Sequence, residues 1–246
     1  MNIIAVIPAR YASTRFPAKA LALLDGKPII QHVYQRVLDS GLFTRVIVAT
    51  DHVLIMEAVA AFGGESVITS QQHNSGSDRI AEAIAGFSEA DIVFNVQGDE
   101  PFIDALALKN LVSAFADSKV QMASLMTPLT DTAMLSNPNI VKVVTDKSGK
   151  ALYFSRSSIP FFRDNDIIPC YYRHIGVYAY RRETLLQFVS LDQGFLEQAE
   201  KLEQLRALEN GIPIHMILTD YQGIGIDTPE DLLNAESYIR TKATEK

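Results

Sequence analysis

The chain begins, after two residues, with the stretch IIAVIPARYASTRFPAKAL at positions 3–21. Its first five residues are apolar and predict a buried strand that ends at Pro8. The next eleven residues carry three cations and no acid: Arg10, Arg15 and Lys19. Because ligands of open α/β sheets bind at the carboxyl ends of the strands, cations on this loop predict a polyphosphate site. A loop of solvated surface cations is the other interpretation.

Composition places the chain among globular proteins. Its 246 residues suit one large α/β domain or two small ones. The hydrophobic fraction of 48% is enough for a sizeable core. The formal net charge of −7 argues against nucleic acid as a partner, because nucleic-acid binding needs a basic surface. The one cysteine, Cys170, leaves no internal disulfide, which suits a reducing compartment. No signal peptide is visible and no apolar run approaches the roughly 20 residues that span a bilayer, so a cytoplasmic protein without a membrane partner is expected.

Strands and helices alternate through the first half of the chain. Apolar runs predict further strands at residues 45–50, 66–69 and 91–96, and helical spacing of apolar residues follows each of the four strands. The first helix is predicted to begin at Pro28 and to stop at Gly41. This alternation of strands and helices predicts a doubly wound, mostly parallel Rossmann-like sheet between layers of helices.

The second half has a different character. Strands are predicted over five segments, of which the second and third form a hairpin: residues 120–126, 141–145, 151–155, 173–180 and 214–218. A helix is predicted around residues 196–208, and Thr228 with Pro229 starts a last helix. The simplest account is a single domain over residues 1–246, a three-layer α/β/α fold with an inserted antiparallel lobe.

The first loop resembles the signature loop of the sugar-activating cytidylyltransferases, and it is most similar to that of the CMP-Kdo synthetase family, where Kdo is 3-deoxy-manno-octulosonate. That family's loop runs as IPARYxSTRxPGKPL, and residues 7–21 here read IPARYASTRFPAKAL. Ala18 and Ala20 replace the family's glycine and proline. If the family's glycine adopts a positive φ, Ala18 is strained at that position.

Two acidic motifs resemble the metal-binding motifs of the same family. Asp99 stands in QGD at the end of the fourth strand, and Asp227 stands in IDTPED before the last helix. The resemblance implies that both bind Mg²⁺, which prefers one or two carboxylates together with substrate phosphates. A helix cap for Asp99, and a charge that favours the helix dipole for Asp227, are the other interpretations.

The segment SGSDR at residues 75–79 resembles the family's base-reading segment, although a helix cap with a surface arginine would fit it as well. The resemblance implies a nucleotide-binding half over about residues 1–118. Nine residues are predicted to contact the nucleotide: Ala9, Arg10, Ser13, Arg15, Lys19, Ser75, Gly76, Arg79 and Gln97. Catalysis is predicted for three residues that neutralise charge on the phosphates or hold the metal: Arg15, Lys19 and Asp99.

The second half carries three more segments that resemble family signatures, ALYFSRSSIP, RHIGVYAY and EKLEQLRALENG. They imply a sugar-binding and dimerisation lobe over about residues 119–220, followed by the closing metal motif and the C-terminal helix over about 221–246. Five residues are predicted to bind the sugar: Arg156, His174, Tyr178, Glu203 and Gln204. Strand alternation puts His174 and Tyr178 on one face, although a packed histidine is the more ordinary interpretation.

The resemblance as a whole implies a Mg²⁺-dependent nucleotidyltransferase. It would join CTP to Kdo, a 2-keto sugar acid, and give CMP-Kdo and pyrophosphate for lipopolysaccharide biosynthesis, as a homodimer. Two alternatives remain open. The sugar could be 8-amino-Kdo or a sialic acid, or the chain could be a non-catalytic nucleotide-binding module, although both aspartate motifs are intact. The sequence contains neither a P-loop nor a dinucleotide fingerprint after the first strand.

Overall fold

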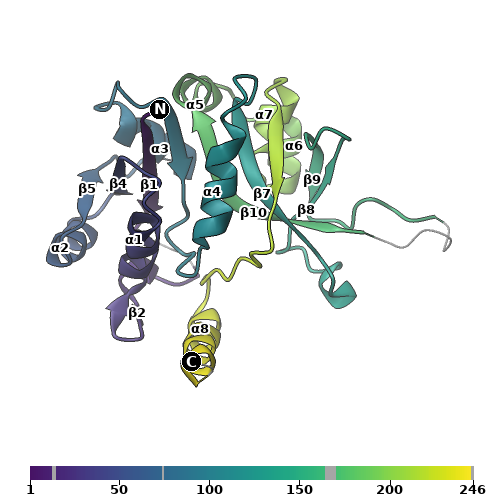
Figure 1. Ribbon diagram of the computed structural model, residues 1–246. Coiled ribbons are helices and arrows are strands. Elements are labelled where there is room, and N and C mark those ends of the chain that lie inside the picture. The colour runs from purple at the N-terminus through teal and green to yellow at the C-terminus, as the bar shows by residue number, and fades with distance from the viewer. Residues whose placement is uncertain (13–14, 74, 164–169, 245–246) are drawn as a thin grey trace. The chain divides into compact units, whose positions relative to one another are not determined.

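Figure 1 shows a computed structural model of the chain, which describes residues 1–12, 15–73, 75–163 and 170–244. The chain divides into two compact units. The first unit combines Met1–Leu108 with Gly223–Lys246, and the second unit is Lys109–Gln222. No helix in the described part of the chain combines the length and the apolar character needed to cross a membrane. The functions assigned to the parts of the chain from its sequence stay predictions.

The first unit is built on parallel strands, as predicted. Their spatial order is β6 (Ile92–Asn95), β1 (Ile3–Ala9), β4 (Arg45–Thr50) and β5 (Glu65–Ile68). The predicted end of the first strand at Pro8 is wrong, because β1 continues to Ala9. β6 pairs with β1 only as far as Val6, and the backbone nitrogen of Pro8 faces that side, so its missing N–H breaks no ladder bond.

The helices of the first unit cover both faces of these strands. They are α1 (Ile29–Asp39), α2 (Val53–Ala61) and α3 (Gly76–Ile84). A fourth helix of this unit, α8 (Pro229–Thr244), packs against Leu24 and Ile29, while α4 (Ala105–Ala114) begins in the first unit and ends in the second. β1, β4 and β5 follow one another in one direction, and β6 adds on the other side of β1. Because such crossovers are right-handed, α3 lies on the opposite face from α1 and α2.

The first helix begins one residue later than predicted. Pro28 closes a short strand, β3 (Lys27–Pro28), which pairs with β2 (Leu23–Leu24), so α1 starts at Ile29. Its predicted stop is confirmed, because the chain leaves the helix at Gly41 with φ +66°.

The reversal of strand order between β1 and β6 is a topological switch point, where open α/β sheets leave a crevice at the carboxyl ends of the strands. The loop that follows β6 comes very close to β1 here. A Cβ built on Gly98 would lie 2.9 Å from the carbonyl oxygen of Pro8. Glycine is therefore required for the loop after β6 to pass this close to the end of β1.

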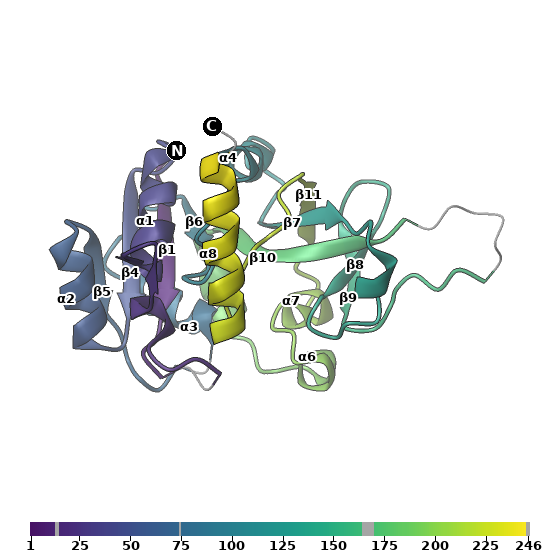
Figure 2. The same ribbon diagram turned by 90° about the horizontal axis from the view of Figure 1, so that it is seen from below.

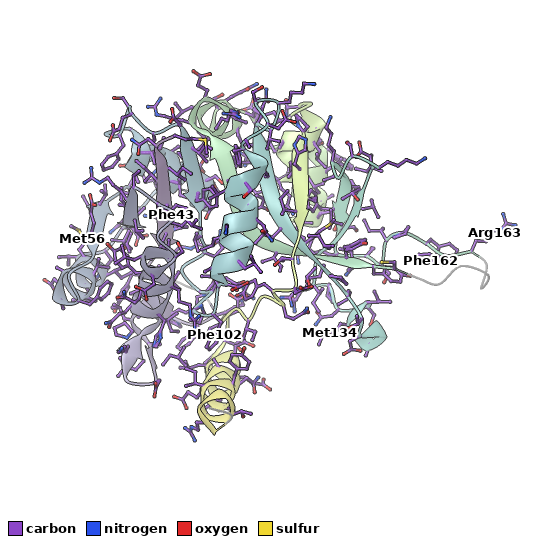
Figure 3. All side chains as sticks on the ribbon, in the orientation of Figure 1. Phe43, Met56, Phe102, Met134, Phe162 and Arg163 are labelled. Atoms are coloured by element: carbon purple, nitrogen blue, oxygen red, sulfur yellow. The ribbon has the colours of Figure 1, made fainter. Side chains whose placement is uncertain are left out.

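The last helix is fastened to the first unit by an apolar cluster. Leu24, Ile29, Ile226 and Ala235 are buried together, and Phe102 packs against them. Phe102 is labelled in Figure 3. Its ring lies edge-on to that of Tyr238 in α8, with 5.0 Å between the ring centroids. This packing brings the residues that precede α8 back to the strand ends of the first unit.

The second unit contains the predicted antiparallel lobe. β10 (Tyr172–Arg181) pairs antiparallel with β7 (Met122–Pro128), whose other neighbour is the parallel strand β11 (Ile214–Leu218). β8 (Lys142–Thr145) and β9 (Ala151–Ser155) form the predicted hairpin beside the start of β10 (Figure 2). Parallel strands in the first unit and an antiparallel lobe in the second confirm the predicted fold class.

The helical part of the second unit differs from the prediction. The single helix expected around residues 196–208 is two short helices, α6 (Phe195–Glu200) and α7 (Leu205–Glu209), because Lys201 adopts a left-handed conformation with φ +53°. Arg206 and Glu197 link them by two buried hydrogen bonds of 2.7 Å. A further helix, α5 (Arg182–Val189), was not predicted.

Candidate active site

A cavity of about 270 Å³ opens at the switch point of the first unit, and we call it the switch-point cavity. Four segments that are far apart in the sequence line it. Ten predicted site residues meet there: Ala9, Arg10, Arg15, Lys19, Ser75, Gly76, Arg79, Gln97, Asp99 and Asp227. The eleventh residue predicted to bind the nucleotide or the metal, Ser13, lies outside the described residues. The rule that strand ends share one edge of a sheet therefore located this cavity correctly.

Lys19 holds the two predicted metal ligands together. Its ammonium donates to Asp99 Oδ2 at 2.6 Å and to Asp227 Oδ1 at 3.0 Å. Burial alone would lower the pKa of Lys19, but the carboxylates of Asp99 and Asp227 outweigh it and raise that pKa. The lysine is therefore a charged link between segments 208 residues apart in sequence.

The position of Asp227 follows from the backbone around it. The N–H of Ile226 donates to the carbonyl of Asp99 at 2.9 Å, and the N–H groups of Asp227 and Thr228 donate to Asp231 of α8. Thr228 Oγ1 accepts from the N–H of Asp231, which confirms the predicted helix start. The side chain of Asp227 remains on the cavity side, where Arg15 Nη2 also approaches it at 3.1 Å.

The donor set suits a magnesium ion. Asp99 and Asp227 share one ammonium, so their carboxylates lie close enough together to share one metal. The cations Arg10 and Arg15 in the same cavity could bind phosphates. Among the described residues, no three His, Cys, Asp or Glu side chains form a cluster that would hold a metal without a substrate. The arrangement therefore fits a metal whose remaining ligands come from phosphates and water.

The segment that begins α3 forms one wall of the cavity. Ser75 caps the helix, since its Oγ accepts from the N–H of Asp78 at 3.1 Å while Asp78 accepts from the N–H of Ser75. The cap is confirmed, but the interpretation of Arg79 as a surface residue is wrong, because its side chain is only 3% exposed. Its guanidinium donates to Asp51 Oδ2 at 3.0 Å and to Thr69 Oγ1 at 2.5 Å.

Sequence reasoning missed two polar side chains, His73 in the lining of the cavity and Asp51 behind Arg79. His73 lines the cavity, and its Nε2 pairs with Glu82 of α3. Asp51 follows β4 directly and anchors Arg79. A signal for Asp51 was present, because it stands at the same edge of the sheet as Asp99, but a single acid after a strand is too common to single out.

Arg156 in the second unit is held by backbone carbonyls. Its Nε donates to the carbonyl of Glu200 at 2.7 Å, Nη1 to that of Pro138 at 2.7 Å and Nη2 to that of Lys201 at 3.3 Å. The N–H of Arg156 donates in turn to the carboxylate of Glu200. Arg156 is thus fixed beside the turn that leads to Glu203.

His174 and Tyr178 lie on one face of β10, as strand alternation predicted. Their ring centroids are 5.4 Å apart, and His174 Nε2 contacts the hydroxyl of Ser124 at 2.9 Å. Burial, with a smaller effect from the Arg173 cation, lowers the pKa of His174 to about 3. The histidine is therefore neutral and packed. Burial, and then the charges of Tyr180 and Glu203, raises the pKa of Tyr178.

Gln204 is 5% exposed, and its Nε2 has no hydrogen-bond partner among the described residues. A buried amide N–H without a partner is costly unless a ligand or water accepts from it. The structure therefore brings His174 and Tyr178 together, places the charge of Glu203 near Tyr178 and leaves Gln204 with a free donor. Residues 164–169, which precede β10, lie outside the described residues.

Comparison with known proteins decides the family. A cytidylyltransferase family profile matches residues 4–216. A relative from Geotalea daltonii is 51% identical over 244 residues, covering 94% of this chain and 96% of its own. Another from Flavobacterium johnsoniae is 51% identical over 243 residues, covering 98% and 99%. Both are named 3-deoxy-manno-octulosonate cytidylyltransferase. The chain belongs to this family.

One solved structure agrees with this assignment, and a second shares the fold. A structure of CMP:2-keto-3-deoxy-manno-octonic acid synthetase complexed with CTP is 40% identical, with a TM-score of 0.94, and the match covers 98% of this chain and all of that one. A 4-diphosphocytidyl-2C-methyl-D-erythritol synthase from Anaerococcus prevotii has a TM-score of 0.65 at 15% identity over 97% of this chain and 98% of its own, which shows a shared fold alone. Membership in the 3-deoxy-manno-octulosonate cytidylyltransferase family confirms the prediction of a cytidylyltransferase.

The signature loop of this family is strained in the present chain. Ala18 adopts φ +54° and ψ +26°, in the left-handed region that glycine occupies without cost. Its N–H donates to the carbonyl of Tyr11 at 3.0 Å and closes the loop. The strain expected where alanine replaces the family's glycine is confirmed.

Proposed function

We infer that the chain transfers CMP from CTP to Kdo. The observation that carries this inference is the switch-point cavity, in which ten residues assigned to CTP and metal meet from four separate segments. The match to the relatives named for this activity covers almost the whole length of those relatives. In the reaction, the anomeric hydroxyl of the sugar attacks the α-phosphorus and loses its proton, and the bond from that phosphorus to the β-phosphate oxygen breaks. The products are CMP-Kdo and pyrophosphate.

The cations of the first loop would neutralise the phosphates. Arg10 and Arg15 are exposed at the mouth of the cavity, whereas Lys19 is held deeper by the two aspartates. Charge grows on the departing pyrophosphate, so preorganised cations stabilise the transition state more than the bound substrate. Arg15 and Lys19, together with the metal ligand Asp99, are the catalytic residues of this proposal.

Magnesium would be held by Asp99 and Asp227. When bound, it neutralises phosphate charge and supports the α-phosphorus as an electrophile. Asp99 and Asp227 now bind the Lys19 ammonium, so their carboxylates are already gathered for a cation. This gathering supports magnesium as the cofactor.

The base would lie against the start of α3, where Ser75, Gly76 and Arg79 reach the cavity together with Gln97. Small side chains at the helix start leave space for a pyrimidine ring. A buried arginine and an amide offer donors that suit the acceptor-rich edge of cytosine. A wrong base would leave these donors unpaired, which is a strong source of selectivity.

The sugar would bind the second unit through Arg156, His174, Tyr178, Glu203 and Gln204. The neutral imidazole of His174 would form part of the wall beside the Kdo carboxylate, while the cationic charge comes from Arg156. The buried amide of Gln204, which has no partner among the described residues, supports this placement because sugar hydroxyls would satisfy it.

A homodimer through the second unit is part of the proposal. Leu152 of β9 is 61% exposed and Phe161 is 87% exposed, which supports an apolar contact on this lobe. Light scattering coupled to size exclusion tests it: Leu152→Glu with Phe161→Glu should give monomers. A wild-type monomer would remove this part of the proposal.

The proposed reaction is tested by incubating the protein with CTP, Mg²⁺ and a panel of sugar acids and measuring pyrophosphate release. Kdo should give the highest kcat/KM, above 8-amino-Kdo and a sialic acid. Preference for another sugar acid would keep the reaction class and change the substrate. Tight CTP binding with no turnover on any sugar would indicate a non-catalytic module.

A further inference from the structure

Asp51 has a position that no substrate assignment uses. It follows Thr50, the last residue of β4, and Thr50 lies in register with Ala9 at the end of β1. The side chain is 11% exposed. It therefore stands at the carboxyl edge of the strands, between the first loop and the segment that begins α3.

The two carboxylate oxygens of Asp51 bind different segments. Oδ1 accepts from the backbone N–H of Tyr11 at 3.1 Å, and Oδ2 accepts from Arg79 Nη2 at 3.0 Å. These contacts are 40 residues back and 28 residues forward in sequence. One side chain thus joins two walls of the switch-point cavity.

The contact with Tyr11 extends through the first loop. The carbonyl of Tyr11 accepts from the N–H of Ala18, the residue before Lys19, and the ring of Tyr11 stacks on His52 at 4.0 Å between centroids. Asp51 therefore holds one end of a loop whose other end carries Lys19.

The contact with Arg79 fixes the direction of a buried guanidinium. Thr69 Oγ1 accepts from Arg79 Nη1 and itself donates to the carbonyl of Thr50 at 3.0 Å. A buried arginine without its carboxylate is an uncompensated charge and is expected to change its orientation. Asp51 and Thr69 together keep the remaining face of the guanidinium toward the cavity.

We propose that Asp51 is the positioning residue for nucleotide recognition, holding the first loop and Arg79 in the geometry that selects cytosine. This inference rests on the proposed binding of CTP in the switch-point cavity. It assigns a specificity role to a residue outside those assigned to CTP, the metal or the sugar.

The test compares Asp51→Asn with Glu65→Gln. An asparagine keeps an oxygen that can accept from Tyr11 but loses the charge that fixes Arg79. Glu65→Gln is the matched control, because it removes an exposed ion pair with Arg45 on the neighbouring strands of the same unit. Asp51→Asn should raise the KM for CTP by about tenfold and lower the CTP-to-UTP ratio of kcat/KM to a similar extent, since coupled buried groups interact with this order of energy.

The KM for the sugar should change by less than about twofold in Asp51→Asn, and Glu65→Gln should change none of these values. A double variant, Asp51→Asn with Arg79→Met, separates positioning from general loosening. If Asp51 acts through Arg79, the double variant should discriminate against UTP no worse than Arg79→Met alone. Additive losses, or an unchanged CTP-to-UTP ratio in Asp51→Asn, would overturn the inference.

Thr69→Val covers the case in which Asp51→Asn fails to fold. It leaves the contact between Asp51 and Tyr11 and removes the hydrogen bond from Arg79 to Thr69 Oγ1. The CTP-to-UTP ratio of kcat/KM should therefore fall, while cooperative thermal unfolding shows that the variant is folded. An unchanged ratio would contradict the inference. Calorimetric titration of the wild type with CTP keeps the two claims apart, because a wild type that does not bind CTP defeats the proposed function itself.

Discussion

At the scale of single residues, Ala18 in the first loop shows how one side chain introduces conformational strain. A non-glycine residue in the left-handed region is disfavoured by about 1–2 kcal/mol, and Ala18 stands there with φ +54°. The sequence predicted this strain from the family's glycine, but it could not give the angle, because φ depends on how the loop closes onto Tyr11.

Ala18→Gly should stabilise the protein. Relief of the strain exceeds the added entropy of the unfolded glycine, so the free energy of unfolding should rise by about 0.5–1 kcal/mol in urea. Ala20→Gly is the matched control, because Ala20 is buried in the 3₁₀ helix Lys19–Leu21. This substitution should lower the free energy of unfolding of the protein. A loss of stability in Ala18→Gly would contradict the strain.

Lys19 acts as the cation between Asp99 and Asp227 when no metal is bound. Lys19→Met leaves two neighbouring carboxylates that repel each other, so Mg²⁺ without CTP should raise the melting temperature of this variant more than that of the wild type. Lys27→Met, at an exposed lysine, should respond as the wild type does. Equal responses to Mg²⁺ in the Lys19 variant and the wild type would show that these carboxylates do not take up the metal.

His174 makes the stability depend on pH. Its folded pKa is about 3 against about 6.5 when unfolded, so below pH 6.5 the unfolded chain binds a proton that the folded chain does not. Stability is therefore lost as pH falls from about 6.5 toward 3. Between pH 7 and 5, the wild type should lose about 2 kcal/mol more than His174→Gln in urea unfolding. Parallel pH curves for the two proteins would contradict a buried neutral histidine.

At the scale of elements, the sequence predicted strands better than the short helices. Apolar runs such as residues 45–50 mark buried strands whatever surrounds them. The break between α6 and α7 depends on the left-handed Lys201, for which neither proline nor glycine gives a signal. Tertiary contacts decide it, since Glu197 and Arg206 form a buried ion pair across the break.

The hairpin of β8 and β9 contains a buried lysine that anchors the segments beside it. Lys142 is fully buried, and its ammonium donates to the carbonyls of Asn137 at 3.2 Å, Ile140 at 2.6 Å and Arg156. Lys142→Met would leave these carbonyls without their donor. The free energy of unfolding should fall by about 2–4 kcal/mol.

Lys147→Met, in the exposed turn of the same hairpin, is the control for Lys142→Met and should change stability by less than about 0.5 kcal/mol. Both variants are measured by urea unfolding of the full chain. Equal stabilities would show that the buried ammonium contributes nothing net. Loss of the carbonyl anchor beside Arg156 should also raise the KM for the sugar more than the KM for CTP.

At the scale of the whole molecule, the site was predictable where topology determines it. Residues that follow β1 and β6 share one edge of a parallel sheet, so Arg10 and Asp99 could be placed together from the sequence. Asp227 needed the family motif, because the packing of α8 that returns it to the cavity has no local signal. Asp51 and His73 were missed, since their importance lies in partners that only the folded chain reveals.

The most direct test of the account is a ³¹P NMR measurement on the purified protein with CTP, Mg²⁺ and Kdo. Attack of the sugar hydroxyl on the α-phosphorus predicts one new phosphodiester resonance, that of CMP-Kdo, and free pyrophosphate in equal amount. Both should be absent when Kdo is omitted and should be strongly reduced in Asp99→Asn. Appearance of CDP with inorganic phosphate, or of CMP and pyrophosphate without the sugar, would contradict the proposed transfer.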